Sequence, residues 1–425
     1  MTSSTTCADA ARHAGAVMPD RTRVFVTGLG AVCCLGGSVP EFWQALLEGR
    51  SGLRPIDRFD LEGIPYSTGG QVVGMTPRPF SQTGVSMGAQ LAAEAAGEAV
   101  RGLPQELREG LALVLATNFG PSEVLEDLLD AGFAPAWAST GRLRLHEGPF
   151  AWDVDHVAEA VGAGGARICI SLSCSSGNAA LAHALALLRG GHASAVLAGA
   201  YDSIQKIVWA GLACLRIMAL GTEGKAPRVR PFDLDRSGTI FSEGAGMLLL
   251  ESAEHAAKRG AKPLAELAGA SSNNNAYHMT HADQEGRATA EAIQMALQDA
   301  RISPEAVSYV NAHGTGTKLN DAIETRAFKS VFDERTKDIP VTSLKGGLGH
   351  AMGAASALEA VACVLALQEG AVPPTINYET PDPECDLNLV TGAPLKADVR
   401  AVVNNSAGIG GGNAVTVFAK PGGQG

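Results

Sequence analysis

Cys174 is the residue best placed for covalent chemistry. A β-branched run, Ile168–Leu172, precedes it, and Ala and Leu at helical spacing follow from Asn178. The stretch therefore predicts a buried strand, a tight turn and a buried helix, with the cysteine at the turn. A thiol beside the free N–H groups of a helix N-terminus has its anion stabilised by the helix dipole, and the thiolate is the reactive form. The pattern indicates a cysteine nucleophile.

Two histidines lie in turns of small residues, where catalytic groups are often found. His313 follows the apolar run Val307–Ala312, and His350 follows the glycines of 346–349 and precedes an Ala-rich helix. Loops at strand ends commonly carry function, and histidine exchanges protons near neutral pH. The glycine-rich turn 404–413 has backbone N–H groups that can bind an anionic oxygen.

Each of these features also has an ordinary structural interpretation. Cys174 alone could be a small buried core residue, and a single histidine is usually a hydrogen-bonded structural group. Cys174, His313 and His350 could also be zinc ligands, but the sequence has no closely spaced ligand pair, so we expect no metal site. Taken together, the three residues favour catalysis.

Buried strands alternate with Ala-rich helices along the chain. The apolar runs typical of strands are 23–32, 111–117, 168–172, 193–200, 245–250, 307–312 and 415–419. This alternation predicts an α/β fold with helices covering the sheets. A charged segment and Pro263 interrupt the pattern near the middle, and we expect one half over 23–261 and a second over 262–425. A GxG pair at Gly28 and Gly30 lacks the third glycine of a dinucleotide site, so we expect it to permit a tight turn.

The composition indicates a folded soluble protein. The 425 residues carry a net charge of −11 without any basic run, which argues against nucleic-acid binding. Eight scattered cysteines without a CxxC pair indicate free thiols and a cytoplasmic location. The uncharged stretch from 168 to 188 is interrupted by serines and a turn, so we expect core and no membrane contact. Residues 1–22 look like a disordered extension, for which organelle targeting stays open.

With these residues in this order, the chain resembles the β-ketoacyl-(acyl-carrier-protein) synthases of the elongating type, in the thiolase superfamily, which include the type II polyketide ketosynthases. The resemblance runs from about Arg23 to Lys420 and includes HGTxT at 313–317, KxxxGH at 345–350 and GxGGxN at 408–413. It implies a thiolase-like fold of two duplicated halves in a five-layered αβαβα arrangement. The implied reaction is decarboxylative Claisen condensation of an acyl thioester with a malonyl carrier protein.

The resemblance also implies a role for each site residue. Cys174 takes the acyl chain as a thioester, and the backbone N–H groups of Cys174 and Ile409 form its oxyanion hole. His313 and His350 bind the malonyl thioester carbonyl and stabilise the enolate. Lys345, paired with Glu324, fixes the charge and position of the histidines.

Substrate contacts follow from the same resemblance. Thr315 and Thr317 contact a phosphopantetheine arm that the carrier protein brings, so no other cofactor is implied. Phe119 falls where the acyl pocket ends. Ala407 and Ile409 stand where the family usually has Phe, and Ile409 replaces its gate. These departures favour a specialised polyketide or polyene pathway over fatty-acid synthesis.

The implied partners are an acyl carrier protein and a second subunit. The second subunit joins through the first half, either as a homodimer or with a chain-length-factor-like protein. Basic residues are scarce around 81–88 and 219–224, which suggests altered carrier docking. Two alternatives stay open: a non-catalytic chain-length-factor-like subunit, which usually lacks the nucleophile, and a coenzyme-A-dependent thiolase, which needs a second catalytic cysteine that Cys385 does not match.

Overall fold

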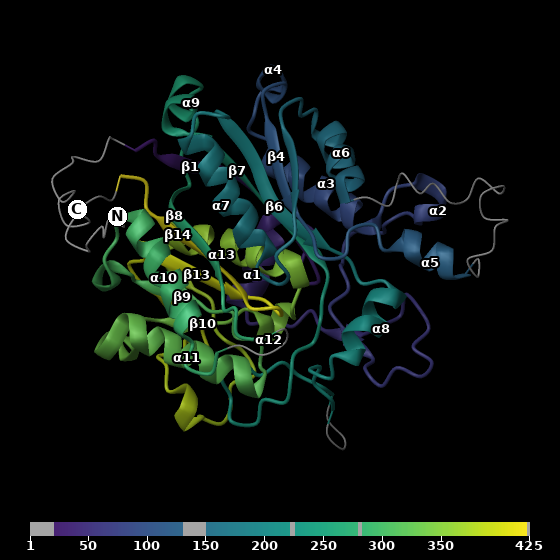
Figure 1. Cartoon of the computed structure of the whole chain (residues 1–425), viewed down its shortest axis with the longest axis vertical. Helices are drawn as coiled ribbons and strands as arrows, with labels where there is room; N and C mark the ends of the chain where they lie inside the picture. Colours follow the sequence, from purple (N-terminus) through teal and green to yellow (C-terminus); the bar gives the residue numbers. More distant parts are fainter. Residues whose placement is uncertain (1–20, 131–149, 222–225, 279–282, 423–425) are drawn as a thin grey trace, which may run out of the picture.

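The computed structural model describes residues 21–130, 150–221, 226–278 and 283–422 (Figure 1). The predicted extension over 1–22 therefore lies outside the described residues except for Arg21 and Thr22. Arg21 donates to the backbone oxygen of Asp299 at 2.6 Å and also pairs with its carboxylate. The described chain thus begins anchored to helix α10 (Arg287–Ala300).

Ten strands of the described chain form one sheet made of two halves. The first half has the order β5-β4-β6-β7-β1, with bounds β1 Val24–Cys33, β4 Ala112–Ala116, β5 Arg167–Ile170, β6 Ala195–Asp202 and β7 Gly244–Ser252. The second has the order β10-β9-β13-β14-β8, with bounds β8 Ala265–Asn274, β9 Tyr309–Asn311, β10 Val341–Thr342, β13 Ala401–Ala407 and β14 Gly412–Ala419.

The two halves repeat one topology. If the strands of each half are counted along the chain, both halves have the order third, second, fourth, fifth, first. The third, second and fourth strands run parallel, and the fifth is antiparallel to both of its neighbours. The halves meet where β1 pairs with β8 at only two positions, Phe25 with Glu266 and Val26 with Ala265. The predicted duplication is confirmed.

Three layers of helices alternate with the two halves of the sheet (Figure 1). Helices α3 (Met87–Ala99) and α6 (Phe150–Val161) cover the outer face of the first half. Helix α10 covers the outer face of the second half, with α11 (Lys318–Phe332) packed on it. Helices α7 (Ser176–Arg189) and α13 (Ala355–Glu369) lie between the halves and contact strands of both. The arrangement is the predicted five-layered αβαβα fold.

Helix α13 is apolar because it is covered on almost all sides, whereas α7 keeps one face at the surface. Almost every residue of α13 from Ala355 to Leu367 is buried. The window Met352–Glu369 is long and apolar enough to cross a membrane, but 83% of it is buried inside the protein, as expected of a core helix. Gly177 lets the two central helices approach, because an added Cβ would lie 2.5 Å from the Ala357 nitrogen.

The remaining elements are short or peripheral. They are α1 (Val39–Leu47), β2 (Arg54–Pro55), β3 (Thr68–Gly69), α2 (Phe80–Thr83), α4 (Gln105–Arg108), α5 (Glu123–Asp130), α8 (Lys206–Cys214), α9 (Ala253–Lys258), α12 (Lys345–Leu348), β11 (Ala371–Val372) and β12 (Leu395–Lys396).

The prediction that Gly28 and Gly30 form a tight turn is wrong. Both lie inside β1, where an added Cβ would come within 2.0 Å of the Ala99 oxygen and 1.8 Å of the Ala95 oxygen, respectively. Their role is to let helix α3 approach the strand, which a side chain would prevent.

Candidate active site

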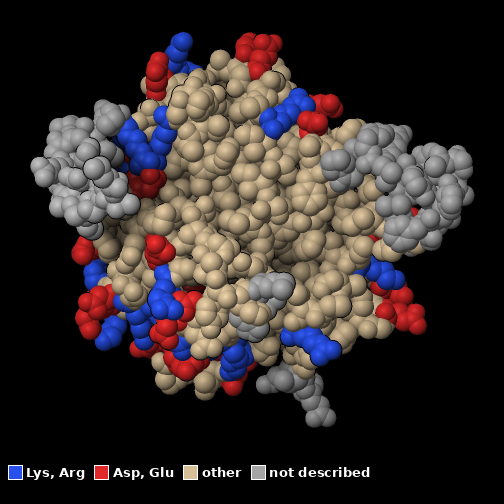
Figure 2. Space-filling view, in the orientation of Figure 1, with Lys and Arg blue, Asp and Glu red and all other residues tan. Residues whose placement is uncertain are grey.

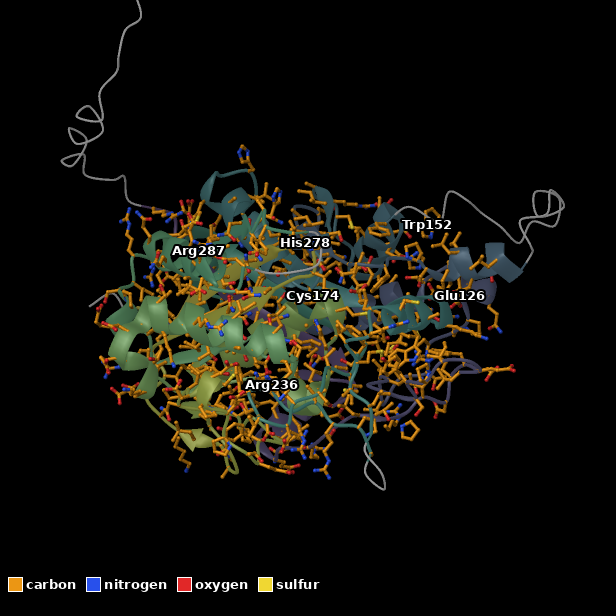
Figure 3. The ribbon with its side chains drawn as sticks, turned by 60° about the horizontal axis from the view of Figure 1, so that its bottom comes forward. Glu126, Trp152, Cys174, Arg236, His278 and Arg287 are labelled. Atoms are coloured by element: carbon orange, nitrogen blue, oxygen red, sulfur yellow. The ribbon has the colours of Figure 1, made fainter. Side chains whose placement is uncertain are left out.

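Cys174 lies in a sharp turn between β5 and α7. Ser173 has a φ of 51°, a left-handed conformation that non-glycine residues rarely adopt. Ser176 holds the turn, since its hydroxyl donates to the Ser173 oxygen at 2.6 Å and accepts from the Leu172 nitrogen at 2.8 Å. Figure 3 shows Cys174 near the middle of the molecule, and the residue is only 8% exposed.

The position at a helix N-terminus does not by itself set the pKa of Cys174. Burial raises the pKa of the Cys174 thiol above its ordinary value, because an anion there loses its hydration. The Ser173 hydroxyl, the Ile409 N–H and the Lys345 charge act in the opposite direction without outweighing burial. The resting nucleophile is therefore a thiol.

His313 and His350 come from separate loops and meet edge to face. Their ring centroids are 5.3 Å apart with an interplanar angle of 85°, and each residue is 3% exposed. Burial, followed by the charge of Lys345, lowers the pKa of both rings well below the usual value. Both are neutral at physiological pH. Each can then donate one N–H without repelling a second charge.

Lys345 pairs with Glu359, and this corrects the predicted pairing with Glu324. The Lys345 Nζ lies 2.5 Å from a carboxylate oxygen of Glu359, and both side chains are fully buried. Glu359 belongs to α13, and Lys345 is the first residue of α12. Since burying an unpaired ammonium is costly, this carboxylate is what allows a lysine in the core.

The lysine also fixes the tautomer of His313. Its Nζ lies 3.4 Å from His313 Nδ1, and an ammonium only donates. Nδ1 must then be the acceptor, so the ring proton resides on Nε2. This nitrogen becomes the one available to donate to a substrate oxygen.

Glu324 instead shapes the loop that carries His313. Its carboxylate accepts from the backbone nitrogens of His313 at 2.6 Å and Gly314 at 2.8 Å, and from the Asn405 amide at 2.7 Å. Burial raises its pKa to about 7 despite these bonds. Glu324 therefore acts on the backbone of the loop and not on Lys345.

The glycine-rich turn brings Ile409 to Cys174. The Ile409 N–H acts on the cysteine sulfur and lowers the pKa of its thiol. A Cβ added to Gly408 would lie 3.2 Å from the Cys174 nitrogen, so the two backbones are in close contact. The backbone of Gly408 and Ile409 thus lies against that of Cys174.

One cavity of about 540 Å³ brings most of the predicted residues together. Its lining includes Cys174, His313, Thr315, Thr317, Glu324, His350, Ala407 and Ile409. Thr315 and Thr317 share a hydrogen bond of 2.9 Å between their hydroxyls. Ile409 lines the cavity and is 41% exposed. Lys345 lies behind His313 and not on the cavity wall.

Phe119 is not among the residues that line this cavity. Its ring packs against the cluster that contains Met218, Phe241 and Met352. Phe241 does line the cavity and stacks on His350 with centroids 5.6 Å apart. The aromatic residue beside the histidine is thus Phe241.

The sequence reasoning missed three residues of the site: Phe241, Glu359 and Asn405. Glu359 had a signal, because it is the only charged residue in the Ala- and Leu-rich run 353–368. Asn405 lies in the glycine-turn motif, and its buried Oδ1 has no hydrogen-bond partner among the described residues. No group of three or more His, Cys, Asp or Glu residues in the described ranges is placed to hold a metal ion.

Comparison with known proteins matches both halves of the chain. The Beta-ketoacyl synthase N-terminal domain matches residues 21–105 and 155–256, and the Beta-ketoacyl synthase C-terminal domain matches residues 264–379. The chain is 36% identical over 414 residues to 3-oxoacyl-(acyl-carrier-protein) synthase 2 of Synechocystis sp. (strain ATCC 27184 / PCC 6803 / Kazusa), covering 94% of this chain and 99% of that protein.

Two solved structures are also similar over nearly the whole chain. The ishigamide ketosynthase/chain length factor has a TM-score of 0.86 at 33% identity and covers 95% of this chain and 100% of its own. A type II PKS acyl-carrier protein in complex with its hexaketide-bound ketosynthase has a TM-score of 0.87 at 35% identity, with the same coverage. The chain belongs to the β-ketoacyl synthase family.

Proposed function

We propose that this protein catalyses decarboxylative Claisen condensation of an acyl thioester with malonyl-acyl carrier protein. The observation that carries the proposal is the convergence of Cys174, His313 and His350 on one cavity of about 540 Å³. A nucleophile and two neutral N–H donors are the groups that the two half-reactions need.

In the first half-reaction Cys174 takes the acyl group. Its sulfur attacks the acyl carbonyl, and the amide N–H groups of Cys174 and Ile409 hold the oxyanion. The bond from the carbonyl carbon to the carrier sulfur breaks, and the carrier leaves as a thiol with the proton that Cys174 gives up. No net proton is consumed, which suits a nucleophile that rests as a thiol.

In the second half-reaction the malonyl group loses carbon dioxide. The electron pair of the broken C–C bond moves into the thioester, and His313 and His350 donate N–H bonds to the enolate oxygen. The enolate carbon then attacks the acyl carbonyl on Cys174, and the cysteine sulfur leaves as a thiolate that takes up one proton from the solvent. Lys345 holds the His313 tautomer that this donation requires.

The phosphopantetheine arm belongs to the carrier protein and enters as part of the substrate. Thr315 and Thr317 line the cavity on the loop that carries His313, where their hydroxyls can bind the polar atoms of the arm. The solved relative that is bound to its acyl-carrier protein supports a carrier as the partner.

We place the activity in specialised polyketide or polyene synthesis, with fatty-acid elongation as the alternative. Ala407 and Ile409 leave the turn beside Cys174 without an aromatic gate. The similarity to the ketosynthase of a type II PKS supports this choice. The described cysteines are free thiols, in keeping with the proposed cytoplasmic location.

The second subunit is proposed to join through the first half, which we keep at 23–261 with the second half at 262–425. Strand β5 ends its sheet, so its outer edge is unpaired among the described residues. Figure 2 shows that the face over α7 carries almost no charged side chain, whereas charges gather over α10 and α11. The partner is a second copy or a chain-length-factor-like subunit, as in the ishigamide complex.

The two alternatives have less support. A non-catalytic subunit has no need of Cys174 and both histidines in one cavity. A thiolase requires a second cysteine at the site, but Cys385 is buried in the core of the second half with Phe328 and Val341. Cys214 does line the cavity, at the end of α8, yet it is exposed and outside the C-terminal half.

Purified protein with an acyl carrier thioester and malonyl carrier protein tests the proposal. We expect β-ketoacyl product and carbon dioxide in equal amounts, and neither with Cys174→Ala. Condensation by the pure protein indicates a homodimer, whereas condensation only after addition of a chain-length-factor-like subunit indicates the heterodimer. Absence of product in both cases would reject the function.

A further inference from the structure

We propose that Asp202 is a positioning residue whose hydrogen bonds hold the turn of Cys174 in a fixed position relative to the loop of His350. Asn118 adds hydrogen bonds between the same two segments. We call the hydrogen bonds of these two side chains the lock. The proposal rests on the proposed function, because it concerns the step in which both loops act on one bond. Neither residue touches the reacting atoms in our account, and neither has been assigned a role above.

Asp202 gathers three segments at one point. It ends β6 and is 1% exposed. Its Oδ1 accepts from the Thr117 hydroxyl at 2.7 Å and from the amides of Asn118 at 3.0 Å and Phe119 at 3.1 Å. Its Oδ2 accepts from the Gly353 amide at 2.7 Å. The four donors occupy the hydrogen-bonding capacity of both carboxylate oxygens, and none of these donors is a cation.

Strand order explains why these segments meet. Strands β5, β4 and β6 are parallel neighbours, so their carboxyl ends lie at one edge of the sheet. Cys174 follows β5, residues 117–119 follow β4, and Asp202 ends β6. Gly353 comes from the second half, three residues after His350. The bond between Asp202 and Gly353 therefore joins the nucleophile's half to the histidine's loop.

Asn118 completes the connection to Cys174. With its amide nitrogen turned towards the nucleophile turn, it donates to the Ser173 oxygen at 2.8 Å and the Ser176 hydroxyl at 3.0 Å. In the same orientation its oxygen accepts from the Gly353 amide at 3.2 Å. Ser173 and Ser176 flank the cysteine, so the path from Cys174 to the His350 loop runs through one side chain.

Gly353 is tightly packed against Asp202 and Asn118. A Cβ added to Gly353 would lie 2.7 Å from Asp202 Oδ2 and 2.9 Å from the amide end of the Asn118 side chain, closer than real Cβ atoms are found. Met352, the residue before it, has a φ of 54°, so the loop is already held in a left-handed conformation. A change at either end should shift the loop of His350 relative to Cys174.

The lock matters for only one of the chemical steps. Acylation needs Cys174 and its oxyanion hole, and decarboxylation needs the two histidines. Bond formation needs the enolate on the histidines aligned with the acyl group on Cys174, and misplacement of about 1 Å can cost roughly 100-fold in rate. If the lock is loosened, the enolate should more often take up a proton and leave as an acetyl thioester.

The test uses Asp202→Asn and Gly353→Ala in the full-length protein or its complex, with Glu251→Gln as the matched control. Asp202→Asn places an amide N–H against one of the four donors. Glu251 is also fully buried and accepts from Arg259, His255 and Thr27, but it pairs with Ala195 at the far end of β6.

The readout is the ratio of carbon dioxide to β-ketoacyl product, together with acylation of Cys174. We expect each variant of the lock to acylate within about threefold of the parent protein, to condense about 10 to 100 times more slowly and to release several carbon dioxide molecules per product. The double variant should be no worse than the poorer single one. Glu251→Gln should keep a ratio of one.

If Asp202 and Gly353 only stabilised the fold, the expected result would be different. Partial unfolding lowers every rate together and leaves the ratio at one, and that result would overturn the proposal. A parent protein that neither acylates nor condenses would instead reject the proposed function, so the two failures are distinguishable.

Discussion

The pairing of Lys345 with Glu359 can be measured as a coupling energy. At 2.5 Å and an effective dielectric constant near 20, Coulomb's law gives roughly 7 kcal/mol of gross attraction. Desolvation of both charges offsets much of this attraction. We expect Glu359→Leu to lower the free energy of unfolding by about 3 to 5 kcal/mol, because it leaves the Lys345 ammonium buried without a counter-charge.

A double-mutant cycle isolates the pair. Adding Lys345→Met to Glu359→Leu should restore most of the lost stability, since two apolar side chains of similar volume replace two charges. The coupling energy from urea unfolding should then be at least about 2 kcal/mol. A second cycle, in which Lys345→Met is combined with Glu324→Gln, should give a coupling energy of less than about 1 kcal/mol, because Glu324 contacts the backbone of the His313 loop.

Activity separates stability from chemistry in these variants. The stable double variant should still lose malonyl decarboxylation, since no cation remains to hold the His313 tautomer. A coupling energy for Lys345 and Glu324 as large as that for Lys345 and Glu359 would refute the reasoning, as would full decarboxylation by the double variant.

Three further predictions concern single residues. His350→Ala should slow malonyl decarboxylation at least tenfold more than acyl loading, because its N–H stabilises the enolate; equal loss of both steps would assign it another role. Ile409→Phe, assayed with saturated and polyunsaturated primers in competition, should shift product preference by about 1 to 3 kcal/mol, and an unchanged ratio would show that the gate does not select substrate. Asp153 has its pKa raised to about 7 by burial. From about pH 4 to 7 the folded state then binds a proton that the unfolded chain has lost, so stability falls as pH rises, by up to about 1.4 kcal/mol per unit. Asp153→Asn should flatten that slope in urea unfolding, and an unchanged slope would contradict this origin.

The fold was predictable because strand and helix patterns are local. The apolar runs at 111–117, 193–200 and 415–419 became β4, β6 and β14 with small changes in their ends. The duplication needed the strand order, which depends on pairing between residues far apart. The role of Gly28 and Gly30 was not predictable, because a pair of glycines in the sequence fits a tight turn as well as a strand that a helix approaches closely.

The site was predictable where chemistry and motif coincide. Cys174, His313, His350 and Ile409 converge as the resemblance implied. The partner of Lys345 was not predictable, since Glu359 and Glu324 are both acids within about 20 residues of it and only the packing of α13 selects one. The raised pKa of Cys174 also depends on burial, which a helix-terminus argument does not contain.

The central claim is that the Cys174 thiol carries the acyl chain. Intact-mass measurement of the protein after incubation with an acyl carrier thioester tests it most directly. The account predicts the mass of one acyl group on the parent protein, its loss on adding malonyl carrier protein, and no added mass on Cys174→Ala. An acyl group that still attaches to Cys174→Ala would contradict the account.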